Sequence, residues 1–192
     1  MKSDTIAAIA TALSDAGIGI IRISGPEAIA VANRVVVNKK KEHTLKNWQT
    51  HTIHYGFVEE NGTILDEVMV SVMKAPRSYT TEDTVEINCH GGVLLTKRVL
   101  EAVMHAGARM AEPGEFTKRA FLSGRIDLSE AEAVMDLIQA KNQFSMQASI
   151  KQLRGSVAEK VKSLRAALLY EIAFIESALD DPEHISAEGY PK

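Results

Sequence analysis

The spacing of apolar residues changes near residue 115, and this change constrains the fold more than any other feature of the sequence. Before that point, short apolar runs alternate with turn signals, as in domains that mix strands and helices. After it, apolar residues recur every three or four positions, which is typical of helices. The sequence therefore predicts an α+β domain over residues 1–118, followed by the start of a helical domain over residues 119–192.

Turn signals divide the first part into separate elements. Pro26 follows Ser24-Gly25 and occupies a position that favours the start of a helix. Asn61-Gly62 between two apolar runs is a strong signal for a β-hairpin. The predicted strands cover residues 5–12, 19–23, 52–59, 63–73, 84–88 and 109–111. The predicted helices cover residues 26–37 and 91–106, and residues 39–47 are expected to form a loop.

The segment 113–134 contains two turns, Pro113-Gly114 and Ser123-Gly124, on either side of a short basic helix. Three cations lie beside these turns: Lys118, Arg119 and Arg125. Such closely spaced turns can fix the direction of the basic side chains, so a binding site is predicted here. Ser129 with Glu132 matches a capping box, and a helix is expected to begin there.

The last stretch carries an apolar stripe with an eleven-residue repeat. The stripe consists of Ile150, Leu153, Val157, Val161, Leu164, Leu168, Ile172, Ile175 and Leu179. We expect one nearly straight helix about 45 Å long, ended by Asp181-Pro182. The preceding helix can cover part of the stripe, and the remainder predicts further helices or a second subunit.

Composition narrows the possible functions. The chain has 192 residues, a net charge of −3 and one cysteine, which argues against a broad nucleic-acid-binding face and a disulfide framework. Neither a signal peptide nor a membrane span is evident, so we expect a cytoplasmic protein. The sequence also lacks a phosphate-loop motif, a dinucleotide-binding motif and metal-ligand spacing, so we expect no catalytic centre and no metal site.

Two charged residues on predicted strands are candidates for ligand binding. Arg22 lies between turn glycines and is suited to an anionic or carbonyl-rich ligand, unless it is a solvated residue on an exposed strand face. Glu86 lies opposite the apolar residues of its strand, just before a helix N-terminus. Its carboxylate suits the amino and ring N–H groups of a pterin or purine. The alternative is a cross-strand salt bridge.

Arg125 is the third candidate, because the turn before it fixes its backbone. Its alternative is a surface arginine paired with Asp127 or Glu115. The neighbours Cys89 and His90 point to opposite sides of a strand, so they are poorly placed as a thiolate–imidazole pair. We expect Cys89 to be a small buried residue and His90 to close the turn.

Three motifs together resemble the MnmE (TrmE) family of tRNA modification GTPases. They are GIIRISG at residues 19–25, EDTVEINCHGG at 82–92 and PGEFTKRAFLSGRIDLSEAEAV at 113–134. The resemblance spans essentially the whole chain. It implies a homodimeric α+β domain that resembles the folate-binding module of aminomethyltransferases and binds 5-formyltetrahydrofolate. By motif, the folate contacts fall on Arg22, Glu86 and Arg125.

The resemblance also implies properties of a longer protein. A GTPase domain using GTP, Mg²⁺ and K⁺ is inserted in the helical domain of the family, and its position is expected beyond residue 192. With the FAD-dependent partner MnmG (GidA), the family adds an aminomethyl or carboxymethylaminomethyl group at C5 of the wobble uridine (U34) of certain tRNAs. Two alternatives remain for this chain: a stand-alone folate-dependent one-carbon transferase and a non-catalytic dimerisation module.

Overall fold

The computed structural model describes residues 4–180, and its contacts divide the chain into two compact units, Met1–Arg125 and Ile126–Lys192. The first unit combines a sheet with helices, and the second is helical in its described part, as the change in apolar spacing predicts. The division falls after the predicted boundary at residues 118–119. The reason is that helix α3 (Glu115–Leu122) is joined to the sheet unit by ion pairs.

A seven-stranded sheet forms the centre of the first unit, with the strand order β3-β4-β5-β6-β2-β1-β7. All neighbouring strands are antiparallel except β1 and β7, which are parallel. The strands are β1 (Ile6–Ile9), β2 (Ala16–Ser24), β3 (Val36–Val37), β4 (Thr52–Glu60), β5 (Thr63–Met73), β6 (Thr84–Gly91) and β7 (Arg109–Met110).

The six predicted strands are confirmed, with changes at their ends. The hairpin between β4 and β5 turns at Asn61 and Gly62, which have φ of 51° and 80°. Positive φ at both central residues matches the type I′ turn that an Asn-Gly pair favours. Strand β2 begins at Ala16, earlier than predicted, and β6 continues to Gly91.

The two predicted helices of this unit are also present. Helix α1 (Ala28–Val35) begins two positions after Pro26, and the last two residues of the predicted helix instead form β3. Valines are stiff at χ1 and favour a strand where a partner strand is available. Helix α2 (Val93–His105) agrees with its prediction. The predicted loop at 39–47 includes a short 3₁₀ helix, η1 (Leu45–Asn47).

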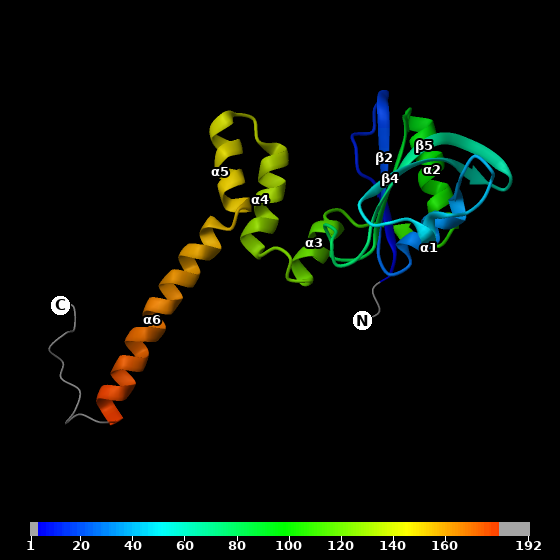
Figure 1. Cartoon of the computed structure of the whole chain (residues 1–192). Helices are drawn as coiled ribbons and strands as arrows, with labels where there is room; N and C mark the ends of the chain where they lie inside the picture. Colours follow the sequence, from blue (N-terminus) through cyan, green and yellow to red (C-terminus); the bar gives the residue numbers. More distant parts are fainter. Residues whose placement is uncertain (1–3, 181–192) are drawn as a thin grey trace. The chain divides into compact units, whose positions relative to one another are not determined.

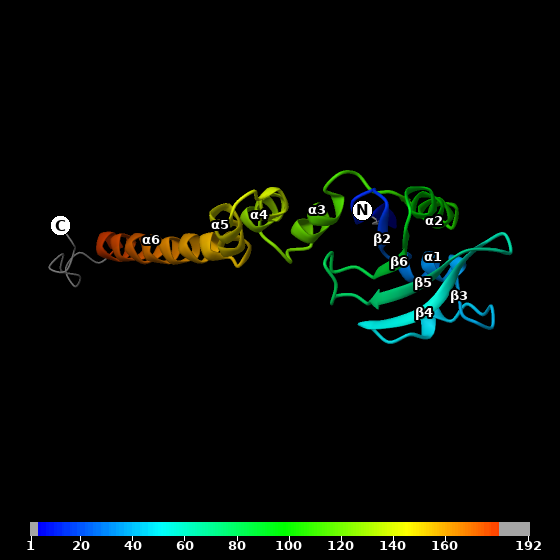
Figure 2. The same cartoon turned by 90° about the horizontal axis from the view of Figure 1, so that it is seen from above.

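Helices α1 and α2 cover one face of the sheet and enclose the hydrophobic core (Figure 1). Side chains of successive strand residues alternate between faces, so Ile21, Val70 and Ile87 all point into this core and are fully buried. The helices contribute Val31 and Val103, among others. Figure 2 shows α1 and α2 on the same side of the strands.

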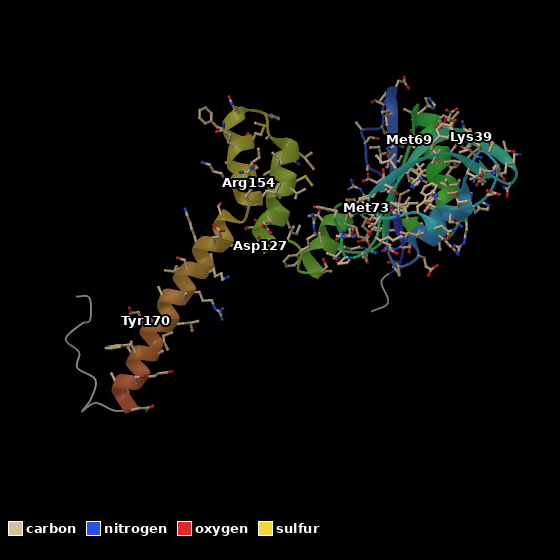
Figure 3. The ribbon with its side chains drawn as sticks, viewed as in Figure 1. Lys39, Met69, Met73, Asp127, Arg154 and Tyr170 are labelled. Carbon is tan, nitrogen blue, oxygen red and sulfur yellow. The ribbon has the colours of Figure 1, made fainter. Side chains whose placement is uncertain are left out.

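The opposite face of the sheet carries polar and apolar side chains that remain partly or largely exposed. Arg22 and Glu86 lie on this face, because their neighbours along β2 and β6 point into the core. Ile53 is 62% exposed, and the labelled Met69 and Met73 lie on β5 (Figure 3). We call this surface the open face.

The described helices of the second unit are α4 (Leu128–Gln139), α5 (Gln143–Leu153) and α6 (Ser156–Asp180). The predicted capping box of Ser129 with Glu132 is wrong by two residues. The N-cap is Asp127, whose side chain accepts a hydrogen bond from the backbone N–H of Glu130, and the Glu130 side chain bonds back to Asp127. Aspartate caps a helix as well as serine does, so the sequence contains two overlapping matches.

The single long helix predicted over residues 150–179 is also wrong, because the chain breaks between α5 and α6. Gly155 has φ of +77°, a left-handed conformation that ends helices. Helix α4 packs beside α5 (Figure 1). No described residue of α6 is buried, and its apolar stripe is exposed, as is Tyr170 (Figure 3). The predicted stop at Asp181-Pro182 lies outside the described residues.

Between residues 4 and 180, no helix has both the length and the apolar character that crossing a membrane requires.

Candidate ligand-binding site

Arg22 and Glu86 form an ion pair at the middle of the open face. They are direct partners in the register between β2 and β6. Nε and one terminal nitrogen of Arg22 lie 2.8 Å and 2.7 Å from the same oxygen, Oε1 of Glu86. Both side chains are half-buried. Among residues 4–180, the other oxygen of Glu86, Oε2, accepts no hydrogen bond, so this pair retains a carboxylate oxygen that can accept one.

An aromatic ring from α3 lies against this ion pair. The guanidinium carbon of Arg22 is 5.7 Å from the ring centroid of Phe116. A cation at this distance from an aromatic face is attracted by the ring quadrupole. The aromatic ring and the ion pair therefore form one continuous surface that is suited to a planar, polar ligand.

Arg125 lies at the other end of α3 and contacts the loop that precedes β6. One of its terminal nitrogens donates to the carbonyl of Tyr79 (3.1 Å), and its guanidinium lies 5.1 Å from the Tyr79 ring centroid. The Tyr79 hydroxyl in turn lies 3.1 Å from the Thr117 hydroxyl. The alternative pairing of Arg125 with Asp127 or Glu115 is not found within the described part of the chain.

A cavity of about 320 Å³ opens on the same face beside Asn88. Its lining residues are Gly17, Ile18, Tyr55, Glu67, Val68, Met69, Asn88, Cys89 and His90. Asn88 follows Glu86 by two positions on β6, so both side chains point to the open face. Small-molecule sites have volumes from about 300 Å³ upward, so this cavity is at the lower end of their range.

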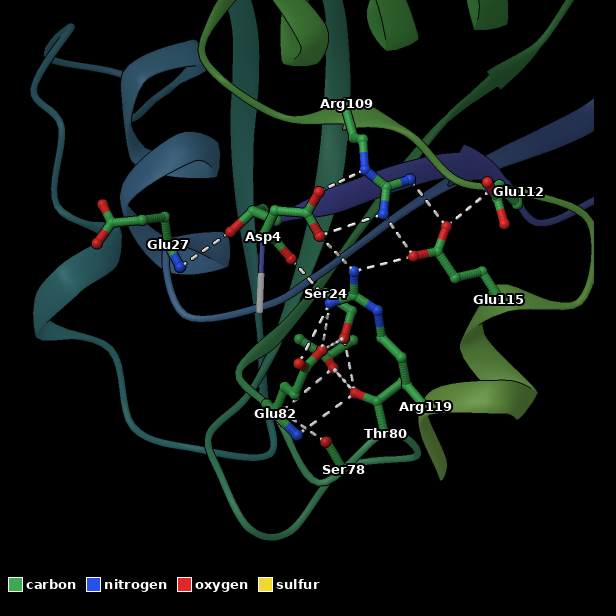
Figure 4. A network of polar contacts seen from close by, with 12 residues as sticks. Asp4, Ser24, Glu27, Ser78, Thr80, Glu82, Arg109, Glu112, Glu115 and Arg119 are labelled. Atoms are coloured by element: carbon green, nitrogen blue, oxygen red, sulfur yellow. Dashed lines mark hydrogen bonds and ion pairs between the residues drawn. The ribbon is translucent and has the colours of Figure 1, made fainter. Parts of the chain in front are cut away.

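A polar network holds α3 against the sheet (Figure 4). Arg119 donates to Asp4, Glu82 and Glu115, and Arg109 donates to Asp4 and Glu115. Hydrogen bonds from Arg109 lower the pKa of the carboxyl groups of Asp4 and Glu115. The side chains of Arg119 and Glu115 are only 12% and 9% exposed, whereas those of Arg109 and Asp4 are about half exposed, so only the Arg119–Glu115 part of the network is shielded from solvent.

Cys89 and His90 do point to opposite sides, as predicted. Cys89 is buried, its thiol donates to the carbonyl of Gly19 (3.3 Å), and burial raises the pKa of the thiol. His90 has a partner that sequence reasoning missed: Nδ1 lies 2.7 Å from Oδ1 of Asp66. Within residues 4–180, no three His, Cys, Asp or Glu residues are grouped so that they could hold a metal ion.

The structure thus brings Arg22 and Glu86 together, while Arg125 joins them only through α3. Sequence reasoning missed Tyr79 and Phe116, the aromatic residues that contact Arg125 and Arg22. Their positions in the sequence could have indicated both residues. Phe116 lies in the segment with the two turns, and Tyr79 lies shortly before the strand of Glu86.

These features define a class of protein. Its members have an α+β domain with charged and aromatic side chains on the open face of the sheet, and helices follow this domain in the sequence. Two family models match the chain, "GTP-binding protein TrmE N-terminus" over residues 5–125 and "MnmE helical domain" over residues 128–190. The first model alone covers more than half of the chain. The chain therefore belongs to the MnmE (TrmE) family, as the three motifs predict.

Curated relatives agree with this assignment. The chain is similar to proteins named tRNA modification GTPase MnmE from Lachnoclostridium phytofermentans (60% identity, 99% of this chain and 42% of the relative) and Listeria welshimeri (51% identity, 98% and 40%). A third, from Carboxydothermus hydrogenoformans, is 50% identical over 100% of this chain and 42% of its own length. The chain thus spans about two-fifths of the length of the curated relatives it matches.

Proposed function

We propose that the α+β unit binds 5-formyltetrahydrofolate on its open face, as the one-carbon donor of a tRNA modification GTPase. The observation that carries this proposal is Glu86, whose Oε1 is held by Arg22 while Oε2 accepts no hydrogen bond among the described residues. A fixed carboxylate with a free oxygen is suited to the adjacent amino and ring N–H donors of a pterin.

The other two candidates take complementary roles in this proposal. Arg22 orients Glu86 and supplies positive charge next to the Phe116 ring. Arg125, held at Tyr79, contacts the formyl, carbonyl or glutamate carboxylate groups of the folate, because a guanidinium binds planar oxygen acceptors well. This chain alone then binds the cofactor without catalysing a reaction.

We propose further that the parent protein hydrolyses GTP with Mg²⁺ and K⁺ in a domain outside this chain. With the FAD-dependent partner MnmG (GidA), it modifies C5 of U34 in certain tRNAs in the cytoplasm. Two findings support this proposal: the relatives are named tRNA modification GTPases, and the chain matches only about two-fifths of their length. We expect deletion of the gene to abolish the U34 modification. Mass spectrometry of tRNA nucleosides measures this loss.

Replacing Glu86 by glutamine is expected to weaken the binding of 5-formyltetrahydrofolate by about 10- to 100-fold, because a charge-assisted hydrogen bond is lost. Isothermal titration calorimetry on the purified chain measures this change. The exposed Glu27, changed to glutamine, is the matched control and is expected to leave the affinity unaltered.

Other results would favour the alternatives. Absence of folate binding by the unmodified chain, together with a dimer in solution, would support a dimerisation module. Chemical conversion of the folate by this chain alone would support a stand-alone transferase. Equal affinities of the unmodified chain and the Glu86→Gln variant would remove Glu86 from the site.

We also propose that the chain forms a homodimer through its first unit. Ile18, Ile53 and Met69 expose large apolar side chains on the open face, and exposed apolar patches of this kind often mark interfaces. Ile53→Asp is expected to shift the chain to a monomer in sedimentation velocity. Leu168→Asp, on the exposed stripe of α6, serves as the control, and dissociation by that variant alone would instead place the interface on α6.

A further inference from the structure

Helix α3 and the turn that follows it carry Phe116 and Arg125, two of the residues of the candidate site. Phe116 lies over Arg22, and the next residue, Thr117, contacts the Tyr79 hydroxyl. Arg125 follows shortly after the helix and contacts the carbonyl and the ring of Tyr79. The position of this one helix therefore sets where two aromatic contacts and one cation meet the open face.

Arg125 is fixed to α3 by the turn that ends the helix. Gly124 has φ of +75°, and its N–H donates to the carbonyl of Phe121 (2.9 Å). The N–H of Arg125 donates to the carbonyl of Ala120 (3.0 Å). These two bonds constitute a Schellman motif, which couples the backbone of Arg125 to the last turn of the helix.

The helix is not held in place by the hydrophobic core. It has only eight residues, too few to be stable without tertiary contacts. Its buried residues are Glu115 and Ala120, while Leu122 is largely exposed. Ion pairs of Glu115 and Arg119 therefore anchor α3 to the rest of the first unit.

Arg119 joins α3 to two other segments of the sheet unit (Figure 4). One terminal nitrogen donates to the carbonyl of Asp4 (2.8 Å) and to Oε2 of Glu82 (3.0 Å). The other donates to Oδ1 of Asp4 (2.8 Å) and to Oε1 of Glu115 (3.0 Å). A planar guanidinium with several donors in fixed directions is suited to such a junction.

The junction continues from Glu82 to the strand that carries Arg22. Oε2 of Glu82 accepts a hydrogen bond from Ser24 (2.9 Å), and Ser24 follows Arg22 by two positions on the same face of β2. Arg109 shares Asp4 and Glu115 with Arg119, but its side chain is more exposed. Because Arg119 also binds Glu82, it connects α3 to the strand of the site.

We propose that Arg119 is a positioning residue for the ligand site: by binding Glu82 and Glu115, it holds α3 so that Phe116 lies over Arg22 and Arg125 lies at Tyr79. Arg119 does not contact the ligand itself. An effect of Arg119 on folate affinity is expected only if the proposed function is correct. An effect of Arg119 on the position of Phe116 is expected in either case.

A tryptophan introduced in place of Phe116 makes the position of the helix measurable without any ligand. In a Trp48→Phe background, Phe116→Trp leaves one tryptophan, placed against the Arg22 guanidinium. Arg119→Gln is expected to shift its emission to the red and to increase its quenching by acrylamide. Arg119→Lys, which reaches fewer carboxylate oxygens, is expected to give an intermediate signal.

Folate titration of the same Arg119 variants without the tryptophan changes supplies the second measurement. Arg119→Gln is expected to weaken binding about tenfold, and Arg119→Lys to restore part of that loss. The control is Arg34→Gln, which removes a contact between α1 and the carbonyl of Ala106. This control is expected to change stability without changing folate affinity or the signal of the introduced tryptophan.

Unchanged emission and affinity in folded Arg119→Gln and Arg119→Lys proteins would overturn the proposal. If Arg119→Gln does not fold, Arg119→Lys and Glu82→Gln give the same comparison. If the unmodified chain binds no folate, the proposed function fails, yet an altered signal of the introduced tryptophan in the Arg119 variants would still support the positioning role.

Discussion

Replacing Leu100 by alanine is expected to lower the free energy of unfolding of the first unit by about 3 kcal/mol. Leu100 lies on α2, is 5% exposed and belongs to the core between the helices and the sheet. Removing a buried leucine side chain loses its transfer free energy and leaves a cavity, which together cost about 2–5 kcal/mol. Urea unfolding followed by circular dichroism measures the change.

The same substitution on the same helix provides the control. Leu94 lies in the first turn of α2 and is 76% exposed. Leu94→Ala removes the same atoms and has nearly the same effect on helix propensity, but it leaves no cavity, so a change within about 0.5 kcal/mol is expected. Equal changes in the free energy of unfolding for the two variants would mean that the side of α2 that carries Leu100 does not pack against the sheet.

The predictions that succeeded depend on local physics. Asn61-Gly62 can adopt the positive φ of a tight turn, and the alternation along β2 and β6 follows from the geometry of any strand. Apart from β3, which the sequence places in a helix, the strands and helices of the first unit could therefore be predicted to within a few residues. The strand order could not, because β6 inserts between β2 and β5 through contacts between distant segments.

The errors in the helical part have a similar cause. Asp127 and Ser129 both match a helix cap, and the choice between them depends on which backbone N–H is in reach. The apolar stripe continues across Gly155 in the sequence, but the left-handed conformation of that glycine interrupts the helix. The spacing of apolar residues indicates which side of a helix is buried, but it does not indicate where the helix is interrupted.

For the candidate site, the sequence predicts three charged residues but not the ion pair between two of them. The sequence predicts Arg22 and Glu86 as two separate candidates and does not indicate that they are partners. In the structure, the cross-strand salt bridge considered for Glu86 is formed, and its partner is Arg22. The salt bridge and the proposed ligand contact are compatible, because the pair uses one carboxylate oxygen and leaves the other.

The polar network also predicts how the stability of the first unit depends on pH. The hydrogen bonds from Arg109 are the main cause that lowers the pKa of Glu115 from 4.5 to about 2, against the opposing effect of burial. Because the pKa is lower in the folded state, Glu115 stabilises the fold above pH 4.5 and loses this contribution as the pH falls toward 2. A pKa change of one is worth about 1.4 kcal/mol, so the loss amounts to about 3 kcal/mol.

The expected result is a free energy of unfolding that falls steeply between about pH 5 and pH 2, and less steeply in a Glu115→Gln variant. Glutamine has nearly the same shape as glutamate but no titratable group. The contribution of position 115 to the pH dependence of the free energy of unfolding is therefore lost in this variant. Glu112→Gln, three residues earlier and exposed, is the matched control and should keep the slope of the unmodified chain. Identical slopes for all three proteins in urea titrations would show that the Arg109 and Arg119 contacts to Glu115 do not stabilise the fold, and α3 would then need another anchor.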